Sequence, residues 1–215
     1  MRLSSVIVCS ALFLITIGCS SAPNKPPEKQ QLKLASAVET EKKDPLLYTA
    51  KPCFTRMSDM AQRWSPDALP FHMESALNPE SNGQDGKATV WRGLFASPSR
   101  GTFKTYTCSG SRLLDQPPVG ITSTVESTSS PVVASLLFHP SFLQTDSDKA
   151  FSIAQQHGGA NLTKKDPKQP VVYLLERDPK HNGIFWYVVY GTSQSDSKGI
   201  GVINASNGAF LRAGK

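Results

Sequence analysis

The chain has 215 residues, of which 39% are hydrophobic and 8% aromatic, and its 23 Lys and Arg side chains exceed its 17 Asp and Glu to give a formal net charge of +6 at pH 7. This composition is typical of a globular protein and excludes a polytopic membrane protein, a collagen and a disulfide-dense miniprotein. The length allows one domain or two small ones.

The N-terminus predicts an export signal. Arg2 precedes an apolar run at residues 6–17, which is too short to span about 30 Å of hydrocarbon as a helix. The run leads to Gly18-Cys19, which resembles the end of the lipobox of bacterial lipoproteins. The resemblance implies that residues 1–18 form a lipoprotein signal peptide, cleaved between Gly18 and Cys19, and that Cys19 carries lipid, palmitate included. A plain secretory signal cut near Ala22 is the alternative.

The next segment predicts a tether. Residues 19–52 carry Ser, Pro, Lys, Glu and Gln with few large apolar side chains, so we expect a flexible tether that begins at the lipidated Cys19. Ser20, directly after this cysteine, resembles lipoproteins of the outer membrane. The expected location is therefore the bacterial cell envelope, with the protein anchored by its lipid to the periplasmic face of the outer membrane.

Two cysteines remain for the folded body. With Cys9 in the signal peptide and Cys19 used for lipid, Cys53 and Cys108 are left, and the periplasm is an oxidising compartment. We predict that they form a disulfide between the first helix and a later strand. Two buried, reduced thiols are the alternative. A redox pair is not expected because neither cysteine belongs to a Cys-x-x-Cys motif.

The body shows the same order of elements twice. In the first half, residues 55–64 have apolar side chains at helical spacing and end at Ser65-Pro66. In the second half, Asp146 is the predicted N-cap of a helix and Gly158-Gly159 its predicted end. The predicted strands are 69–77, with one buried face, 89–96 and 102–108 in the first half, and 171–176, 184–190 and 200–204 in the second.

The halves also align without gaps over residues 90–110 and 185–205, which places Trp91 on Trp186 and Cys108 on Ile203. We therefore predict an α+β fold of two repeats, each with one helix packed on an antiparallel β-meander. The repeats are 53–110 and 146–215. The connector, 111–145, contains one apolar run that either adds a strand or crosses between the halves.

The second half resembles the PepSY domain. The resemblance lies in a helix with Ala150 and Ala154, the strands after it, and a closing stretch, 201–210, that turns at Asn207-Gly208. Through the repeat, the first half is PepSY-like as well. PepSY-like units occur in propeptides of secreted metallopeptidases and in envelope proteins, and tandem helix-plus-meander units are similar in architecture to β-lactamase inhibitory protein. The resemblance implies binding to or inhibition of another protein, without catalysis.

The sequence contains no motif for catalysis. It lacks a nucleophile elbow, a His-Glu-x-x-His zinc motif, a Cys-x-x-Cys pair and a Rossmann glycine run. His72, His139, His157 and His181 stand apart, with no two at ligand spacing, so we expect no catalytic residue, no metal and no cofactor. The positive charge is spread along the chain and not gathered on one helix or face, so a nucleic-acid partner is not expected.

An aromatic run supplies the candidate binding face. Alternation along a strand places Trp186 on one side and Phe185 and Tyr187 on the other. We hypothesise that the sheet face opposite the helices, with Phe185 and Tyr187, binds an envelope protein or peptide. A second layer, packed over that face by the other repeat, is the alternative.

The predicted function follows from the export signal and the resemblance to PepSY domains together. We expect a non-catalytic, membrane-anchored envelope lipoprotein that binds or inhibits another envelope protein, such as a peptidase. The alternative is an envelope hydrolase or ligand-binding carrier whose site is not visible in the sequence.

Overall fold

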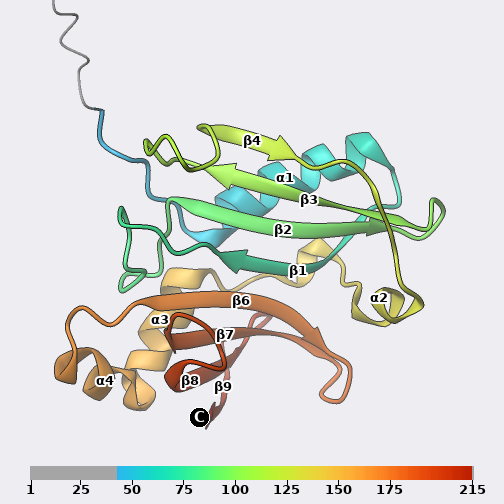
Figure 1. The fold of residues 1–215 in the computed structure, drawn as a ribbon. Coiled ribbons are helices and arrows are strands. Elements are labelled where there is room, and N and C mark those ends of the chain that lie inside the picture. The colour runs from blue at the N-terminus through green and yellow to red at the C-terminus, as the bar shows by residue number, and fades with distance from the viewer. Residues whose placement is uncertain (1–42, 215) are drawn as a thin grey trace, which may run out of the picture. The chain divides into compact units, whose positions relative to one another are not determined.

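Nine strands of the chain form one antiparallel sheet, in the order β4-β3-β2-β1-β6-β7-β8-β9, with β5 paired to β3. The structure is a computed structural model that describes residues 43–214 (Figure 1). The predicted cleavage after Gly18 and the lipid on Cys19 lie outside these residues. The predicted α+β class with antiparallel strands is confirmed.

The element bounds are as follows. The strands are β1 (Leu69–Ser75), β2 (Val90–Ser97), β3 (Thr102–Ser109), β4 (Gly120–Ser123), β5 (Ser127–Thr128), β6 (Val171–Asp178), β7 (Gly183–Gly191), β8 (Ser197–Asn204) and β9 (Phe210–Gly214). The helical elements are α1 (Ala50–Trp64), α2 (Pro131–Leu136), the 3-10 helix η1 (Pro140–Phe142), α3 (Ser147–Ala154), the π-helix η2 (Gln155–Gly159) and α4 (Ala160–Lys165). None of the helices within residues 43–214 is long and apolar enough to span a bilayer.

The two halves lie edge to edge in the sheet. A meander of β1, β2 and β3 follows α1, and a meander of β6, β7 and β8 follows the helices from α3 to α4. The meanders join because β1 pairs with β6 through His72↔Glu176, Met73↔Leu175 and Glu74↔Leu174. Helices α1 and α3 lie behind this sheet in Figure 1. The alternative in which one repeat covers the open face of the other is therefore wrong.

Helix α1 begins earlier than its apolar spacing predicts. It starts at Ala50, before the predicted start at Thr55, and ends at Trp64 as predicted. Pro52 is compatible with this start because the first N–H groups of a helix have no partner within the helix. Ala50 is fully buried, so the predicted boundary of the folded body at residue 53 lies too far along the chain.

One carboxylate caps the first turns of two helices. Asp146 is the N-cap of α3, as predicted, and its Oδ1 accepts the N–H of Ser147 at 2.7 Å and that of Lys51 in α1 at 2.9 Å. Ser147 Oγ accepts the N–H of Ala50 at 2.9 Å and donates to the carbonyl of Gly86 at 2.6 Å. Side chains of the second half therefore fix the start of α1, and the local sequence of α1 carries no sign of it.

Two tryptophans occupy matching positions in the two halves. Trp91 on β2 and Trp186 on β7 are fully buried, and their rings meet edge to face with centroids 6.3 Å apart. Nε1 of Trp91 donates to the carbonyl of Tyr48, just before α1, at 2.9 Å. Nε1 of Trp186 donates to the carbonyl of Thr145, just before α3, at 2.8 Å. The two residues that the sequence alignment matches thus make equivalent contacts, in one core that draws on both halves.

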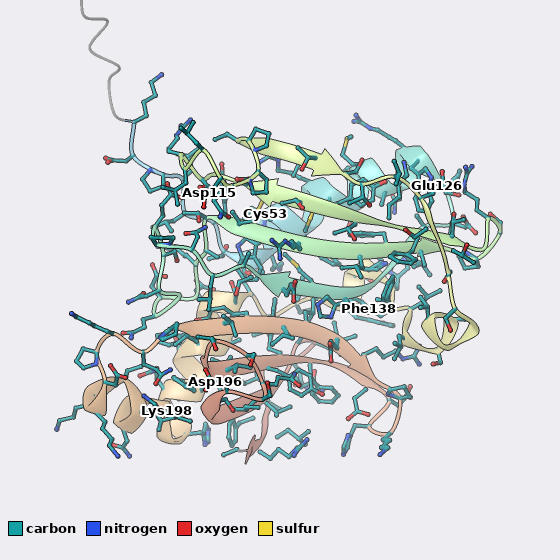
Figure 2. All side chains as sticks on the ribbon, in the orientation of Figure 1. Cys53, Asp115, Glu126, Phe138, Asp196 and Lys198 are labelled. Carbon is teal, nitrogen blue, oxygen red and sulfur yellow. A yellow bond between two sulfur atoms is a disulfide. The ribbon has the colours of Figure 1, made fainter. Side chains whose placement is uncertain are left out.

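The predicted disulfide is present in the structure. Cys53 of α1, labelled in Figure 2, is bonded to Cys108 of β3, with the two Cα atoms 5.6 Å apart. Both residues are fully buried. The bond connects the helix of the first half to the third strand of its meander.

The Gly158-Gly159 pair ends the helix that begins at Ser147, as predicted, and a second short helix follows directly. His157 and Gly158 leave helical conformation, with Gly158 at φ 108°, and the chain then resumes as α4. A Cβ on Gly159 would collide with the hydroxyl and ring of Tyr190, so only glycine allows this approach to β7. Gly158 thus supplies the predicted stop, and Gly159 also permits the close contact with Tyr190.

Strand β1 does not keep one buried face. A bulge between Pro70 and His72 breaks the alternation. Met73 is fully buried on the helix side, whereas the ring of Phe71 meets the ring of Phe103 edge to face at 5.9 Å. The prediction of a single apolar face over 69–77 is therefore wrong.

The connector does not add its apolar run to the sheet as a strand. That run contains the short helix α2, which lies at one end of β1 and β6 in Figure 1. Further along, Phe138 donates its N–H to the carbonyl of Pro70 and stacks on Phe54 of α1, with ring centroids 6.2 Å apart. The connector thus crosses from α2 to the helix side of the sheet, which was the second of the two expected outcomes.

Candidate functional site

The central rows of the sheet divide into a helix-facing side and an open side. Met73, Leu175 and Trp186 are neighbours across β1, β6 and β7, and all three are fully buried beneath the helices. Because side chains alternate along each strand, the adjacent rows point to the opposite face. These rows are Leu94, His72, Glu176 and Phe185, and Arg92, Glu74, Leu174 and Tyr187.

A group of four charged residues lies on the open face where the two halves meet, and we call it the seam cluster: His72, Glu74, Arg92 and Glu176. His72 Nδ1 lies 2.9 Å from Glu176 Oε1, and Nε2 lies 3.4 Å from Glu74 Oε2. Arg92 reaches the other oxygen of Glu74 at 3.8 Å. The histidine side chain is 19% exposed and the two carboxylates 36% and 38%, so carboxylate oxygens still face solvent.

The two carboxylates keep the imidazole protonated. Burial disfavours the charged ring, but its hydrogen bonds with Glu176 and Glu74 outweigh that cost and raise the pKa of His72 to about 9. The hydrogen bond from His72 lowers the pKa of Glu74, against its partial burial, and Arg92 lowers it further. At neutral pH both ring N–H groups therefore donate to carboxylates, and β1 is held to β6 by charge as well as by backbone pairing.

This protonation makes stability depend on pH in a defined window. A folded pKa of about 9 for His72, above the ordinary 6.5, means that the stabilisation is complete below pH 6.5 and is lost as the pH rises through 9. We expect the free energy of unfolding to fall by about 2 kcal/mol between pH 6.5 and 9.5, allowing for the exposed carboxylates. Urea unfolding at a series of pH values measures it.

The matched control for the pH dependence is His72→Gln, whose amide fits the same space but does not titrate. All other titratable groups are the same in the two proteins, so the difference between their pH profiles isolates His72. If the glutamine variant loses as much stability as the native chain over this range, the ring is not held protonated.

Two hollows flank the seam cluster and together form what we call the trough. One, of about 540 Å³, reaches the β7–β8 loop, residues 192–195, and includes Arg92 and Leu174 in its lining. The other, of about 380 Å³, reaches Leu136 of α2 and includes Leu94. Glu74 lines both hollows, so they meet at the cluster. The trough therefore has walls of mixed polar and apolar side chains on either side of a charged centre.

The predicted face lies beside the trough and is only partly available. Phe185 is 4% exposed, with the ring of His181 edge to face against it at 6.1 Å, so Phe185 cannot contribute an exposed surface as predicted. Tyr187 is half-buried and shares its row with Leu174 and Glu74. Trp186 lies on the helix side, as alternation predicts. The open face is thus presented by β1 and β6 more than by β7.

Sequence reasoning did not single out the seam cluster. His72 and Glu74 stood on the polar positions of the predicted strand, which was the available signal. Glu176 is about a hundred residues away, and only the pairing of β1 with β6 brings it to His72. The cluster could not be found without knowing which strands of the two halves are neighbours.

The other histidines serve local contacts. His157 stacks on Phe210 with centroids 3.9 Å apart, His139 Nδ1 lies 2.6 Å from Ser141 Oγ, and His181 pairs with Asp178. Within residues 43–214, no group of three His, Cys, Asp or Glu side chains is placed to hold a metal ion.

Comparison with known proteins supports the fold only. No protein-family model matches the chain. No curated protein sequence matches it either. A similar solved structure is that of a Clostridium difficile 630 protein, provisionally named a lipoprotein. The match has a TM-score of 0.50 and 9% sequence identity, and it covers 75% of this chain and 91% of the other. At this identity the likeness is one of architecture.

Proposed function

We propose that this protein is a lipid-anchored protein of the bacterial envelope that binds a segment of another envelope protein in the trough. The observation that carries the proposal is the trough itself: an uncovered sheet face with a fixed charged centre between two hollows of mixed polar and apolar lining. The face opposite is filled by helices, so the open side is where a partner can reach the sheet.

The chemistry of the trough suits an extended peptide. The exposed oxygens of Glu74 and Glu176 can accept hydrogen bonds from backbone N–H groups or a basic side chain, and Arg92 can donate to carbonyls or a carboxylate. Leu94 and Leu174 give apolar contact beside these groups. A mixed polar and apolar lining of this kind gives orientation and specificity to a bound segment.

The state of His72 argues against a role as a general base. Both of its ring nitrogens are engaged by carboxylates, and with a pKa near 9 the ring has no free lone pair to act as a general base at neutral pH. The nearby Ser75 hydroxyl accepts the N–H of Tyr173. An envelope hydrolase or ligand-binding carrier remains the second candidate, because a histidine between two carboxylates in a hollow is the feature such a site would need.

The anchor and the location rest on the sequence. Gly18-Cys19 supplies the lipobox resemblance, and a lipoprotein name for a protein of similar fold is consistent with it. We place the protein on the periplasmic face of the outer membrane because of Ser20. The partner is an envelope protein, and a secreted peptidase is the candidate that PepSY-like propeptides suggest.

The finer description of the fold as two PepSY-like repeats is part of this proposal. The matched contacts of Trp91 and Trp186 support a duplication, as do two meanders that each follow a helix. In this view the trough lies at the junction of the repeats and exists only because both are present.

The proposal is tested by site-specific photo-crosslinking of the full chain in intact cells. A photoreactive residue at Leu94, in the trough, is expected to give a discrete adduct with one envelope protein, whereas the same residue at the exposed Asp59 of α1 is not. Charge reversal by Arg92→Glu should lower the yield at Leu94 several-fold. Equal labelling from both sites, or none from Leu94, would count against the trough as the binding site.

A further inference from the structure

Exposed apolar side chains gather at the end of the body where the chain enters it. Leu46, Leu47, Leu114 and Val119 are 42%, 44%, 105% and 43% exposed, and we call them the entry patch. Large side chains that stay in water together mark surfaces that meet a partner or a membrane. The entry patch is separate from the trough, because none of the four residues lines either of its hollows.

Two hydrogen bonds hold the two segments of the patch against each other. The N–H of Leu46 donates to the carbonyl of Gly110 at 2.9 Å, and Arg112 Nε donates to the carbonyl of Asp44 at 3.4 Å. A Cβ on Gly110 would collide with Leu46, so glycine permits this close packing. The loop at 110–119, marked by the Asp115 label in Figure 2, therefore lies beside the segment that enters the body.

The loop leaves the side chain of Leu114 exposed to solvent. Its backbone closes on itself through the N–H of Gln116 and the carbonyl of Leu113, at 3.2 Å. Ser109 Oγ also donates to the carbonyl of Pro117 at 2.7 Å. These hydrogen bonds do not involve the Leu114 side chain, so a polar residue at this position would allow the same loop. The apolar side chain at the tip therefore needs a separate explanation.

We infer that the entry patch rests on the lipid bilayer into which Cys19 is anchored. This inference depends on the proposed lipid anchor. Lys43, the first described residue, lies 24 residues after Cys19 and close in sequence to Leu46 and Leu47 of the patch, so the chain between them is long enough for the patch to reach the bilayer that holds the anchor. Burying a few leucine side chains is too little to hold a free protein on a membrane. The anchor makes the contact intramolecular, and weak insertion then suffices.

Charge neither drives nor opposes this contact. Lys43 and Arg112 flank the patch and can reach lipid headgroups, while Asp44 and Asp115 balance them. The entry patch therefore contacts the apolar interior of the bilayer and does not depend on anionic headgroups. The contact should change little between neutral and anionic vesicles.

The test uses the full lipidated chain in vesicles that contain spin-labelled, fluorescence-quenching lipids. A polarity-sensitive fluorophore is attached at Leu114→Cys and, as the matched control, at Lys180→Cys in the exposed β6–β7 turn at the opposite end of the sheet. We expect blue-shifted emission and strong quenching at position 114, and neither at position 180. Because Leu114 is fully exposed, its replacement leaves the core unchanged.

The outcomes separate the orientation from the anchor. Mass analysis of the Cys19 peptide and flotation of the vesicles report the anchor on the same samples. An acylated protein that floats, but whose label at 114 is as exposed as the label at 180, overturns the orientation alone. Absence of acyl groups from Cys19 overturns the anchor and the orientation together.

Discussion

Replacing Cys53 and Cys108 together by alanine is expected to lower the free energy of unfolding by about 4 kcal/mol. The disulfide joins residues 55 positions apart, and a loop of this length removes that much conformational freedom from the unfolded chain. The free energy of unfolding of a native protein is about 5–15 kcal/mol, so this loss is a large fraction of the total. Urea unfolding of the double variant against the oxidised protein measures the difference.

Reduction of the native chain is the control for packing. Reduced protein keeps both sulfur atoms in the core but loses the cross-link, so it isolates the effect of the bond from the effect of the two smaller side chains. We expect reduction to account for most of the loss, because each cysteine loses only one sulfur atom on replacement by alanine and leaves a small space in the core. A double variant as stable as the oxidised protein would show that the bond closes a loop already ordered in the unfolded state.

Local patterns were enough to predict most elements of the fold. The six strands of the two meanders, the end of α1 at Trp64 and the N-cap at Asp146 all follow from side-chain periodicity and capping chemistry within a few residues. The disulfide followed from counting thiols in an oxidising compartment. These features depend on neighbours in sequence or on composition, which the sequence displays directly.

Features that depend on distant neighbours could not be predicted. The start of α1 at Ala50 needs Asp146 and Ser147, and the close approach of the chain at Gly159 needs Tyr190. The burial of Phe185 needs the turn that carries His181. In each case the local residues permit two conformations, and packing against a segment far along the chain selects one.

The candidate site also depends on residues that are distant in sequence. The polar positions of β1 contained His72 and Glu74, but their partner Glu176 is brought by the pairing of β1 with β6. The sequence predicted two meanders and did not predict which edges would meet. The sequence predicted an open face at Phe185, whereas the structure has the open face at the junction of the two halves.

Replacing Trp186 by alanine is expected to lower the free energy of unfolding by about 3–5 kcal/mol and to loosen both halves together. Trp186 is fully buried and touches Trp91 of the first half, and its Nε1 donates to the carbonyl of Thr145. Trp186→Phe is the milder variant: it keeps an aromatic ring but leaves that carbonyl without its donor, for an expected loss of about 1–3 kcal/mol. Denaturant unfolding measures both.

Hydrogen exchange of the Trp186→Phe variant then asks whether the halves are one cooperative unit. Because β1 is bonded to β6 and the two tryptophans share a core, amides of β2 and β3 should lose protection along with those of β7 and β8. If only the second half is affected, the repeats fold independently and the sheet joins two separate units. Since the trough lies on that junction, independent unfolding would also mean that the binding face is assembled only when both halves are folded and docked.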